Sequence, residues 1–341
     1  MARVTIEDVA LAAGLSVATV DRVLNGRAAV RPQTAQKVEK AIRQLNYQPD
    51  RLAARLAKGQ EYRFCFVLPE GNNDFMIGLG EEVRAMASHL VSERVQIDLR
   101  LTDVFDAATL AATLDSIGDI YDGVAVVALD HPRVREAING LVERGVSVVT
   151  LVSDVPSSKR VHYAGIDNSS AGRTAATLMG RFLGGKTGKV GLIAGSLSLR
   201  DHIERRFGFE QVLAQEFPQL AILPVLESRD DWQRVEKVTV EMLSAHPDLI
   251  GIYNVGAGAR GIVAALENTG RQKQVTYIAH ELTDHTRRAL VDGTIDAIIN
   301  QNAGHEVRSA VRVLMAKADR TPLIEAMEHI RIDIFVRDNL P

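Results

Sequence analysis

Short apolar runs recur between residue 61 and the end of the chain, and each is followed by a segment with the apolar spacing of a helix. Strands that alternate with helices are typical of parallel sheets covered by helices on both faces. The pattern therefore predicts an α/β fold for this region. The predicted strands are FCFVLP (64–69), QIDLRLTD (96–103), GVAVVAL (123–129), SVVTLVSD (147–154), KVGLIAG (189–195), AILPVLES (221–228), LIGIYNV (249–255), VTYIAHE (275–281) and IDAIINQN (295–302).

The length of this region predicts two lobes. About 280 residues are too many for one compact sheet, and the pattern breaks near residues 163–167. In parallel α/β folds, ligands bind outside the carboxyl ends of the strands. We therefore expect a binding cleft between the lobes.

The first 60 residues follow a different pattern. Thr5 can cap a helix that ends at Gly14, with Asp8 completing an imperfect capping box. Ser16 can cap a second helix, which Asn25-Gly26 would close. Two short helices joined by a glycine turn are typical of the helix-turn-helix motif. The residues predicted to face inward are Ile6, Val9, Ala10, Ala13, Val20, Val23 and Leu24.

A third helix is predicted from Pro32, and its apolar positions would close a small core: Val38, Ala41, Ile42 and Leu45, with Tyr47. In this motif the start of the second helix enters the major groove, so Val17, Ala18 and Arg22 would face base edges and phosphates. Arg22 is the strongest candidate, because a guanidinium can grip guanine bidentately. The pattern alone leaves DNA binding and a simple helical bundle equally open.

The net charge also differs between residues 1–60, which we call the head, and the rest of the chain, which we call the body. Residues 1–60 contain ten Lys and Arg against five Asp and Glu, a local net of +5, whereas the whole chain is at -3. A basic head on an acidic body is expected if only the head meets phosphates.

The head resembles the LacI family of transcription regulators. The residues that carry the resemblance are VTIEDVALAAGLSVATVDRVLNG (4–26) and VRPQTAQKVEKAIRQLNYQPDRLAARLAKG (30–59). The resemblance implies a hinge helix over residues 50–58, with Leu56 as an apolar wedge in the minor groove of a palindromic operator. It implies DNA contacts from Thr5, Ser16, Val17, Ala18, Thr19, Arg22, Asn25, Arg51, Ala53 and Leu56.

Two features of this region bear on DNA binding. About seven residues after Pro49 are too few for a stable isolated helix, so the hinge should order only on DNA. Asp21 stands where the family usually keeps a small polar residue. Because a carboxylate repels phosphates, we expect an altered operator register or affinity.

The body resembles the type-1 periplasmic sugar-binding fold that the LacI family shares. The resemblance implies three crossings between lobes, near residues 166, 302 and 326. The expected domains are a helix-turn-helix domain (1–48), a hinge helix and linker (49–61) and an effector-binding and dimerisation domain (62–341). Its first lobe would be 62–166 with 303–325, and its second 167–302 with 326–341.

Candidate ligand contacts lie at the predicted strand ends. A sugar-binding site needs an aromatic ring that packs against the C–H faces of the sugar and polar groups that form hydrogen bonds with its hydroxyls. The candidate aromatic rings are Phe75, in the loop after the first strand, and Trp232. The polar candidates are Asn73, Asp74, Asp130, His131, Asp154, Arg205, Asn254, Glu281 and Gln301.

The family resemblance supports Arg205, Trp232 and Glu281 individually. This sequence differs from the family pattern at Asn254-Val255, where the family often has Asn-Asp, so it lacks one carboxylate. Structural hydrogen bonds, solvated loops or core packing explain any one candidate as well. Asp230-Asp231 is interpreted as a charged turn before Trp232.

Two glycine motifs resemble nucleotide-binding motifs instead. Gly180 to Thr187 matches a phosphate-loop pattern, but a predicted helix precedes it and a strand follows, the reverse of what phosphate binding needs. Gly256-x-Gly258-x-x-Gly261 follows a strand and precedes a helix, with Glu281 about twenty residues later, as in dinucleotide-binding proteins. A regulator or oxidoreductase that binds a nicotinamide dinucleotide therefore stays open as the alternative.

The remaining expectations concern chemistry and partners. We expect no enzyme, metal or cofactor, because metal-ligand spacing and a G-x-S-x-G elbow are missing and the lone Cys65 lies in an apolar strand. We expect a cytoplasmic chain with no membrane contact. The predicted function is a regulator, acting as a repressor, that senses a sugar or polyol. A pseudo-palindromic double-stranded DNA operator requires a homodimer.

Overall fold

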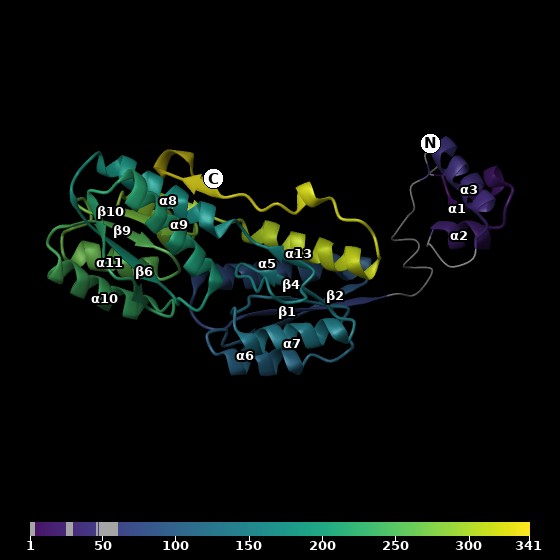
Figure 1. Cartoon of the computed structure of the whole chain (residues 1–341), viewed down its shortest axis with the longest axis horizontal. Helices are drawn as coiled ribbons and strands as arrows, with labels where there is room; N and C mark the ends of the chain where they lie inside the picture. Colours follow the sequence, from purple (N-terminus) through teal and green to yellow (C-terminus); the bar gives the residue numbers. More distant parts are fainter. Residues whose placement is uncertain (1–3, 25–29, 46, 48–60) are drawn as a thin grey trace. The chain divides into compact units, whose positions relative to one another are not determined.

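The computed structural model describes residues 4–24, 30–45, 47 and 61–341 (Figure 1). The chain divides into two compact units, Met1–Glu61 and Tyr62–Pro341. None of the helices in the described ranges is long and apolar enough to cross a membrane.

The N-terminal unit contains the three predicted helices, α1 (Ile6–Ala13), α2 (Val17–Leu24) and α3 (Pro32–Leu45). The capping box of α1 is complete, because Asp8 N donates to Thr5 Oγ1 and Asp8 Oδ2 accepts from Thr5 N at 2.7 Å. Gly14 ends the helix at φ 64°. Thr19 N donates to Ser16 Oγ at 3.3 Å, which caps α2. Their core is Val9, Ala10, Val20, Val38 and Ala41.

The first lobe of the second unit is built on a parallel sheet with strand order β2-β1-β3-β4-β5. Alternate residues of β1 point to opposite faces: Cys65 and Val67 pack under α6 and α7, while Phe64 and Phe66 pack under α5 and α13. The elements are β1 (Tyr62–Pro69), α5 (Asp74–Leu90), η1 (Val91–Glu93), β2 (Val95–Thr102), α6 (Ala107–Asp115), β3 (Gly123–Val126), α7 (Pro132–Glu143), β4 (Ser147–Leu151), β5 (His162–Ala164) and α13 (Ala303–Ala318).

The second lobe contains a sheet of order β12-β11-β10-β9-β6-β7, with β8 paired to β6 and β12 antiparallel to β11. Helices α8 and α9 cover one face, and α10, α11 and α12 cover the other. The elements are α8 (Asn168–Leu183), β6 (Gly188–Ala194), α9 (Arg200–Glu216), β7 (Leu220–Ile222), β8 (Leu226–Glu227), α10 (Trp232–Ala245), β9 (Leu249–Asn254), α11 (Ala259–Asn268), β10 (Thr276–His280), α12 (Asp284–Val291), β11 (Ala297–Asn300) and β12 (Asp333–Phe335).

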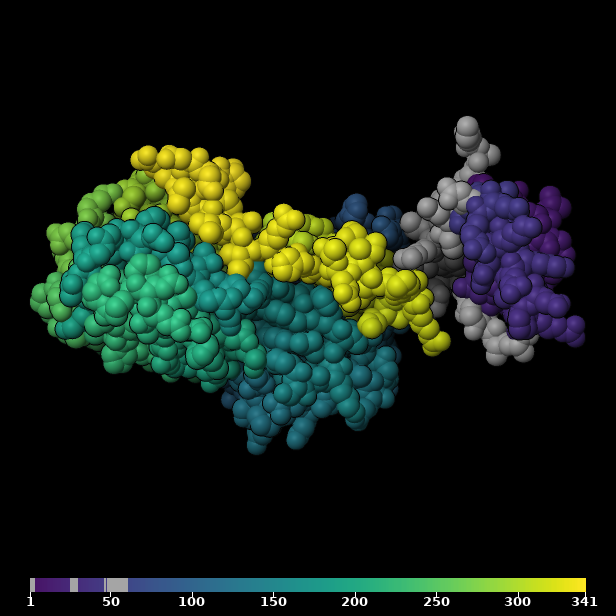
Figure 2. Space-filling model, turned by 45° about the horizontal axis from the view of Figure 1, so that its top comes forward, coloured from purple at the N-terminus to yellow at the C-terminus, as the bar shows by residue number. Residues whose placement is uncertain are grey.

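The chain passes between the lobes after β5, after β11 and after α13. The last passage contains η2 (Glu325–Met327) and lies on the surface of the body, yellow in Figure 2, before β12 and η3 (Arg337–Asn339). The predicted two-lobed α/β class is confirmed. The sequence pattern missed β5 and β12, which have three residues each. It also predicted one strand over 221–228, where Pro224 separates β7 from β8 because proline lacks a ladder donor.

Candidate functional site

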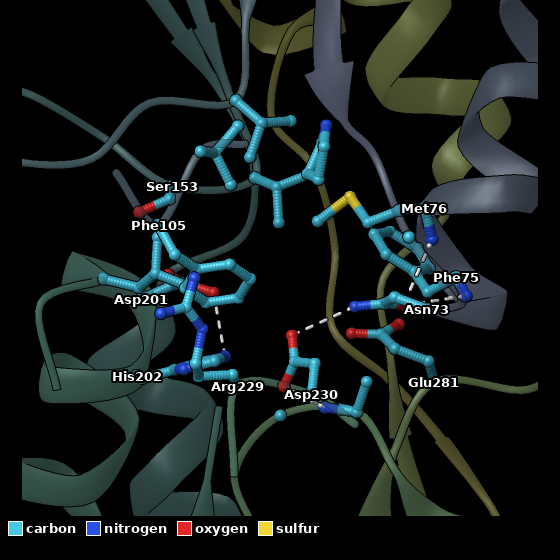
Figure 3. Close-up of a pocket in the computed structure, with 18 of the residues that line it drawn as sticks. Asn73, Phe75, Met76, Phe105, Ser153, Asp201, His202, Arg229, Asp230 and Glu281 are labelled. Atoms are coloured by element: carbon cyan, nitrogen blue, oxygen red, sulfur yellow. Dashed lines mark hydrogen bonds and ion pairs between the residues drawn. The ribbon is translucent and has the colours of Figure 1, made fainter. Parts of the chain in front are cut away.

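Two adjoining pockets lie between the lobes, at the carboxyl ends of the strands. The first, which we call the Arg205 pocket, encloses about 690 Å³ with its open mouth and is lined by both lobes (Figure 3). The second, the Trp232 pocket, shares part of this wall and adds residues of α10, α11 and α12. The shared residues are Asn72, Asn73, Phe75, Asp230, Ala257 and Glu281.

Arg205 lies at the buried wall of the first pocket, with 2% of its surface exposed. Its Nε donates to Asn168 Oδ1 at 2.7 Å and its Nη1 donates to the Val255 carbonyl at 3.0 Å. Close contact of α8 and α9 holds it there, because a Cβ at Gly172 would lie 1.9 Å from the Arg205 carbonyl oxygen. The helix pair therefore fixes the direction of the guanidinium.

Glu281 faces Arg205 from the end of β10, and the distance from Arg205 Nη2 to Glu281 Oε1 is 3.8 Å. Gln301 donates to both carboxylate oxygens, from its backbone N at 3.2 Å and from Nε2 at 2.8 Å. Burial raises the pKa of Glu281 to about 7, against the opposing effect of Arg205. The carboxyl therefore changes charge near neutral pH.

Asp230 stands between the two pockets, on the second lobe. Its Oδ1 accepts from Ala257 N and its Oδ2 accepts from Asn73 Nδ2, each at 3.1 Å. Arg229 and Asp230 are both in the left-handed region, at φ 53° and 59°. The predicted charged turn before Trp232 is therefore present, and it directs Asp230 into the cleft. Asp231 caps α10.

Polar side chains of the two lobes are in contact across the cleft. Besides the bond from Asn73 to Asp230, Arg229 Nη2 lies 3.3 Å from Asp103 Oδ2. Arg200 Nη1 lies 3.4 Å from Asp130 Oδ2. The lobes are therefore in contact through polar groups on several sides of the pockets.

Several buried polar atoms of the Arg205 pocket have no hydrogen-bond partner among the described residues. They include acceptors and donors, and apolar side chains of Phe75, Met76 and Phe105 lie around them. Such groups cost free energy unless a ligand or water satisfies them. These atoms are Ser153 Oγ, Asp201 Oδ1, Arg205 Nη2 and Gln301 Oε1.

Most of the predicted ligand contacts line these pockets: Asn73, Asp74, Phe75, Arg205, Trp232, Glu281 and Gln301. One detail differs from expectation. Phe75 lies in the first turn of α5 rather than in a loop, because Asn73 Oδ1 accepts from Phe75 N and Met76 N and caps that helix.

Four predicted contacts lie outside both pockets. Asp130 and His131 line a separate hollow, where Asp130 is paired with Arg135 and Arg200. Asp154 turns away to form an ion pair with Arg160.

Asn254 is fully buried, and its Nδ2 donates to the Ala257 carbonyl, so it shapes the loop rather than facing the cleft. Sequence reasoning missed Phe105, Ser153, Asp201, His202 and Asp230, all of which line the Arg205 pocket. Asp201 stands four residues before Arg205 on the same helix face, which is a signal that the sequence did contain.

Packing accounts for the glycines of the dinucleotide-like motif. A Cβ at Gly256 would lie 2.8 Å from Asp230 Oδ1, and one at Gly261 would lie 2.1 Å from the Trp232 carbonyl oxygen. Gly258 begins α11 at φ 87°. Asp230 already accepts from Ala257 N at this helix start. Its carboxylate would repel a pyrophosphate there.

The phosphate-loop match has the reverse context, as predicted. Gly184 ends α8 in the left-handed conformation, and Lys186 and Thr187 lead directly into β6. Cys65 is buried, and burial raises its pKa to about 11, which makes a reactive thiolate unfavourable at neutral pH.

In the head, the start of α2 is exposed. Ser16, Val17, Ala18 and Arg22 are exposed, as is Thr5, whereas Thr19 and Asp21 are half-buried. Exposed side chains at the start of the second helix suit binding in a major groove. The predicted contacts Asn25, Arg51, Ala53 and Leu56 lie outside the described residues.

Comparisons with known proteins agree with this organisation. Residues 64–321 match the model of the periplasmic binding protein domain, and residues 5–50 match the model of bacterial regulatory proteins of the lacI family. The fold and the cleft define a two-lobed binding protein with a helix-turn-helix head. The chain belongs to the lacI family of bacterial regulatory proteins, with a periplasmic binding protein domain as its body.

Relatives with assigned names include the HTH-type transcriptional regulator AglR of Rhizobium meliloti (strain 1021), 29% identical over 216 residues, which are 62% of this chain and 58% of AglR. Catabolite control protein A of Staphylococcus epidermidis is 26% identical over 46% of this chain and 57% of its own length. The match thus spans less than three fifths of these two relatives. The regulator GalS of Salmonella typhimurium is 25% identical over 78% of this chain and 76% of its own.

Solved structures share the fold of the body. GanP, a glucose-galactose binding protein from Geobacillus stearothermophilus, has a TM-score of 0.73 at 24% identity, over 83% of this chain and 99% of its own. A solute binding protein of an ABC transporter from Burkholderia graminis, in complex with D-arabinose, has a TM-score of 0.73 at 25% identity, over 82% of this chain and 96% of its own.

Proposed function

We propose that the chain is a sequence-specific, DNA-binding transcription regulator, and that a sugar or related polyol bound between the lobes sets its affinity for an operator. The observation that carries the ligand class is the set of unpartnered buried donors and acceptors in the Arg205 pocket. A polyol satisfies both kinds of group, and its C–H faces suit the phenyl rings of Phe75 and Phe105.

The DNA-binding part of the proposal rests on the head. Its capped helices, its exposed start of α2 and its match to the lacI model support a major-groove reader. We take residues 1–48 as this domain, 49–61 as hinge and linker and 62–341 as the effector and dimerisation domain. A homodimer follows from the need to read two half-sites of a palindrome, and occupancy of the operator would repress transcription.

Ligand and DNA must be coupled through two states of the protein. Ligand bound between the lobes favours closure, and closure moves the first lobes of a dimer relative to each other. That movement sets the distance between the two hinge segments on one operator. The coupling is reciprocal, so operator DNA changes ligand affinity by the same factor.

A thermal-shift screen followed by DNA selection tests the proposal. Purified chain is heated with pentoses, hexoses, polyols, cyclitols, purines and nicotinamide dinucleotides, and a ligand of the folded state raises the melting temperature. Sequences bound from a random duplex library are then compared with and without the stabilising compound. Stabilisation by a polyol and a salt-dependent, ligand-sensitive palindrome support the proposal. Stabilisation by a nicotinamide dinucleotide alone would replace it with the dinucleotide alternative.

A further inference from the structure

The Arg205 pocket carries more acidic than basic side chains. Its two lining arginines already have protein partners: Arg205 binds Asn168 and Val255, and Arg229 pairs with Asp103. The acids that line the pocket are Glu70, Asp201, Asp230 and Glu281.

Among the buried acids that line the pocket, only Asp201 has a carboxylate oxygen without a hydrogen-bond partner in the described part of the chain. It lies in the first turn of α9 and is 4% exposed, and its Oδ1 has no hydrogen-bond partner among the described residues. Its Oδ2 lies 3.6 Å from His202 Nε2. Figure 3 shows Asp201, Asp230 and Glu281 in turn along the second-lobe side of the pocket. A buried carboxylate oxygen without a donor is costly, so the site calls for a ligand that donates there.

Counted with Asp201 Oδ1, the unpartnered atoms of the pocket include two that only accept hydrogen bonds. Gln301 Oε1 is an acceptor, Ser153 Oγ can donate or accept, and Arg205 Nη2 is the one atom of the set that only donates. A ligand with more donors than acceptors fits this wall. An ammonium group has three donors and no acceptor.

Glu306, on α13, is a further buried acid close to Glu281. Its side chain is buried, and both carboxylate oxygens lack a partner among the described residues. Burial, reinforced by the neighbouring Glu281, holds the pKa of Glu306 well above its usual range. The carboxyl is therefore held in its neutral form; a cation bound nearby would lower this pKa, and an anion would raise it further.

We propose that the Arg205 pocket selects a polyol that carries an ammonium group, such as an aminodeoxy sugar, over sugar phosphates and sugar acids. The inference rests on the proposed function, since it names the ligand class of the same site. The ammonium group donates to Asp201 Oδ1, and ligand hydroxyls reach Ser153 and Gln301. The phenyl rings of Phe75 and Phe105 contact the C–H surface of the ligand.

Calorimetric titration with matched ligands tests this. The probes are neutral pentoses, hexoses and inositols with their aminodeoxy, phosphorylated and carboxylate forms, at about pH 6.5, where the amine is protonated. Among the derivatives of the parent compound that binds best, we expect the amine to bind about tenfold more tightly than the neutral form. The phosphate and the acid should bind at least about tenfold more weakly than the neutral form.

Asp201→Asn provides the residue-level test, because it keeps the shape and removes the charge. The ratio of amine to neutral affinity should fall about tenfold in this variant. Glu216→Gln, which removes an exposed acid from the other end of α9, should leave the ratio unchanged. Melting temperatures without ligand verify that both variants are folded.

The outcomes separate the two proposals. Tighter binding of a neutral, phosphorylated or carboxylate form overturns the ammonium inference and leaves polyol sensing in place. An unchanged ratio in Asp201→Asn overturns the role of Asp201 and the inference with it. Absence of binding by every probe overturns the polyol class itself, and with it the ammonium inference and the ligand part of the proposed function.

Discussion

Arg205 and Glu281 face each other across 3.8 Å at the buried wall of the cleft, and neither side chain is satisfied by the other alone. Arg205 is held by Asn168 and Val255, and Glu281 is held by Gln301. Asn168 in turn donates to the hydroxyl of Tyr163, next to the first crossing between the lobes. Gln301 precedes the second crossing. This hydrogen-bonded series therefore connects the pocket with two of the segments at which the lobes are joined.

Glu281 should make the stability of the body depend on pH. Its folded pKa of about 7 lies above the usual 4.5, so the folded state keeps a proton that the unfolded state releases between these values. The free energy of unfolding should consequently decrease as pH rises from about 5 to about 7. Arg205, Asp201, Glu306 and His280 surround the group, and the desolvation of Glu281 outweighs the favourable charge of Arg205.

Urea unfolding followed by the fluorescence of Trp232, the only tryptophan, measures this dependence. The decrease should be smaller in Glu281→Gln and unchanged in the exposed-site control Glu216→Gln. Equal pH dependence in wild type and Glu281→Gln would contradict the assignment.

Asp230→Asn should weaken ligand binding by about tenfold or more. The new amide would place a donor against either Asn73 Nδ2 or Ala257 N, which both donate to Asp230 now. Titration of the stabilising polyol measures the loss. Asp231→Asn is the matched control, because asparagine caps a helix as well as aspartate does. Equal affinities in the two variants would remove Asp230 from the site.

Trp232→Ala should abolish the response to ligand while leaving operator binding without ligand intact. Trp232 lines the second pocket, and the guanidinium of Arg260 lies 4.3 Å from its ring centroid. Trp232→Phe keeps an aromatic face and should retain part of the response. Fluorescence anisotropy with labelled operator measures both properties. A full response in the alanine variant would show that the ring does not contact the ligand.

Gly172→Ala should destabilise the second lobe by about 1–3 kcal/mol, because its Cβ would overlap the Arg205 carbonyl and force α8 and α9 apart. Gly78→Ala is the control within another helix, since nothing lies within 4 Å of its Cβ. That substitution should be neutral or stabilising. Denaturant midpoints compare the two, and a neutral Gly172→Ala would contradict the close helix contact.

Leu56→Ala should reduce operator affinity far more than non-specific DNA binding. The prediction comes from the resemblance of the hinge alone, as Leu56 lies outside the described residues. An apolar wedge contributes only where the DNA is kinked at the operator centre. Affinities for operator and random duplex at one salt concentration give the ratio. An unchanged ratio would argue against the wedge.

Local sequence patterns were sufficient to predict the helices of the head and the fold class of the body. Thr5, Asp8 and Gly14 mark the ends of α1 through bonds to their own neighbours, so they are readable from the chain. The alternation of Phe64, Cys65 and Phe66 indicates a strand with both faces buried. These features depend on residues that are adjacent or one turn apart.

The tertiary structure determined which residues line the cleft. Ser153 and Asp154 are neighbours in sequence, yet Ser153 lines the pocket and Asp154 pairs with Arg160, after a turn in which Val152 has φ 61°. Asp230 reaches the cleft through a similar left-handed turn. Sequence placed polar residues at strand ends, but only the folded chain determined which of them meet. The reason is physical: helix and strand periodicity is local, whereas the direction of a side chain after a turn depends on backbone angles and partners that lie far away in sequence.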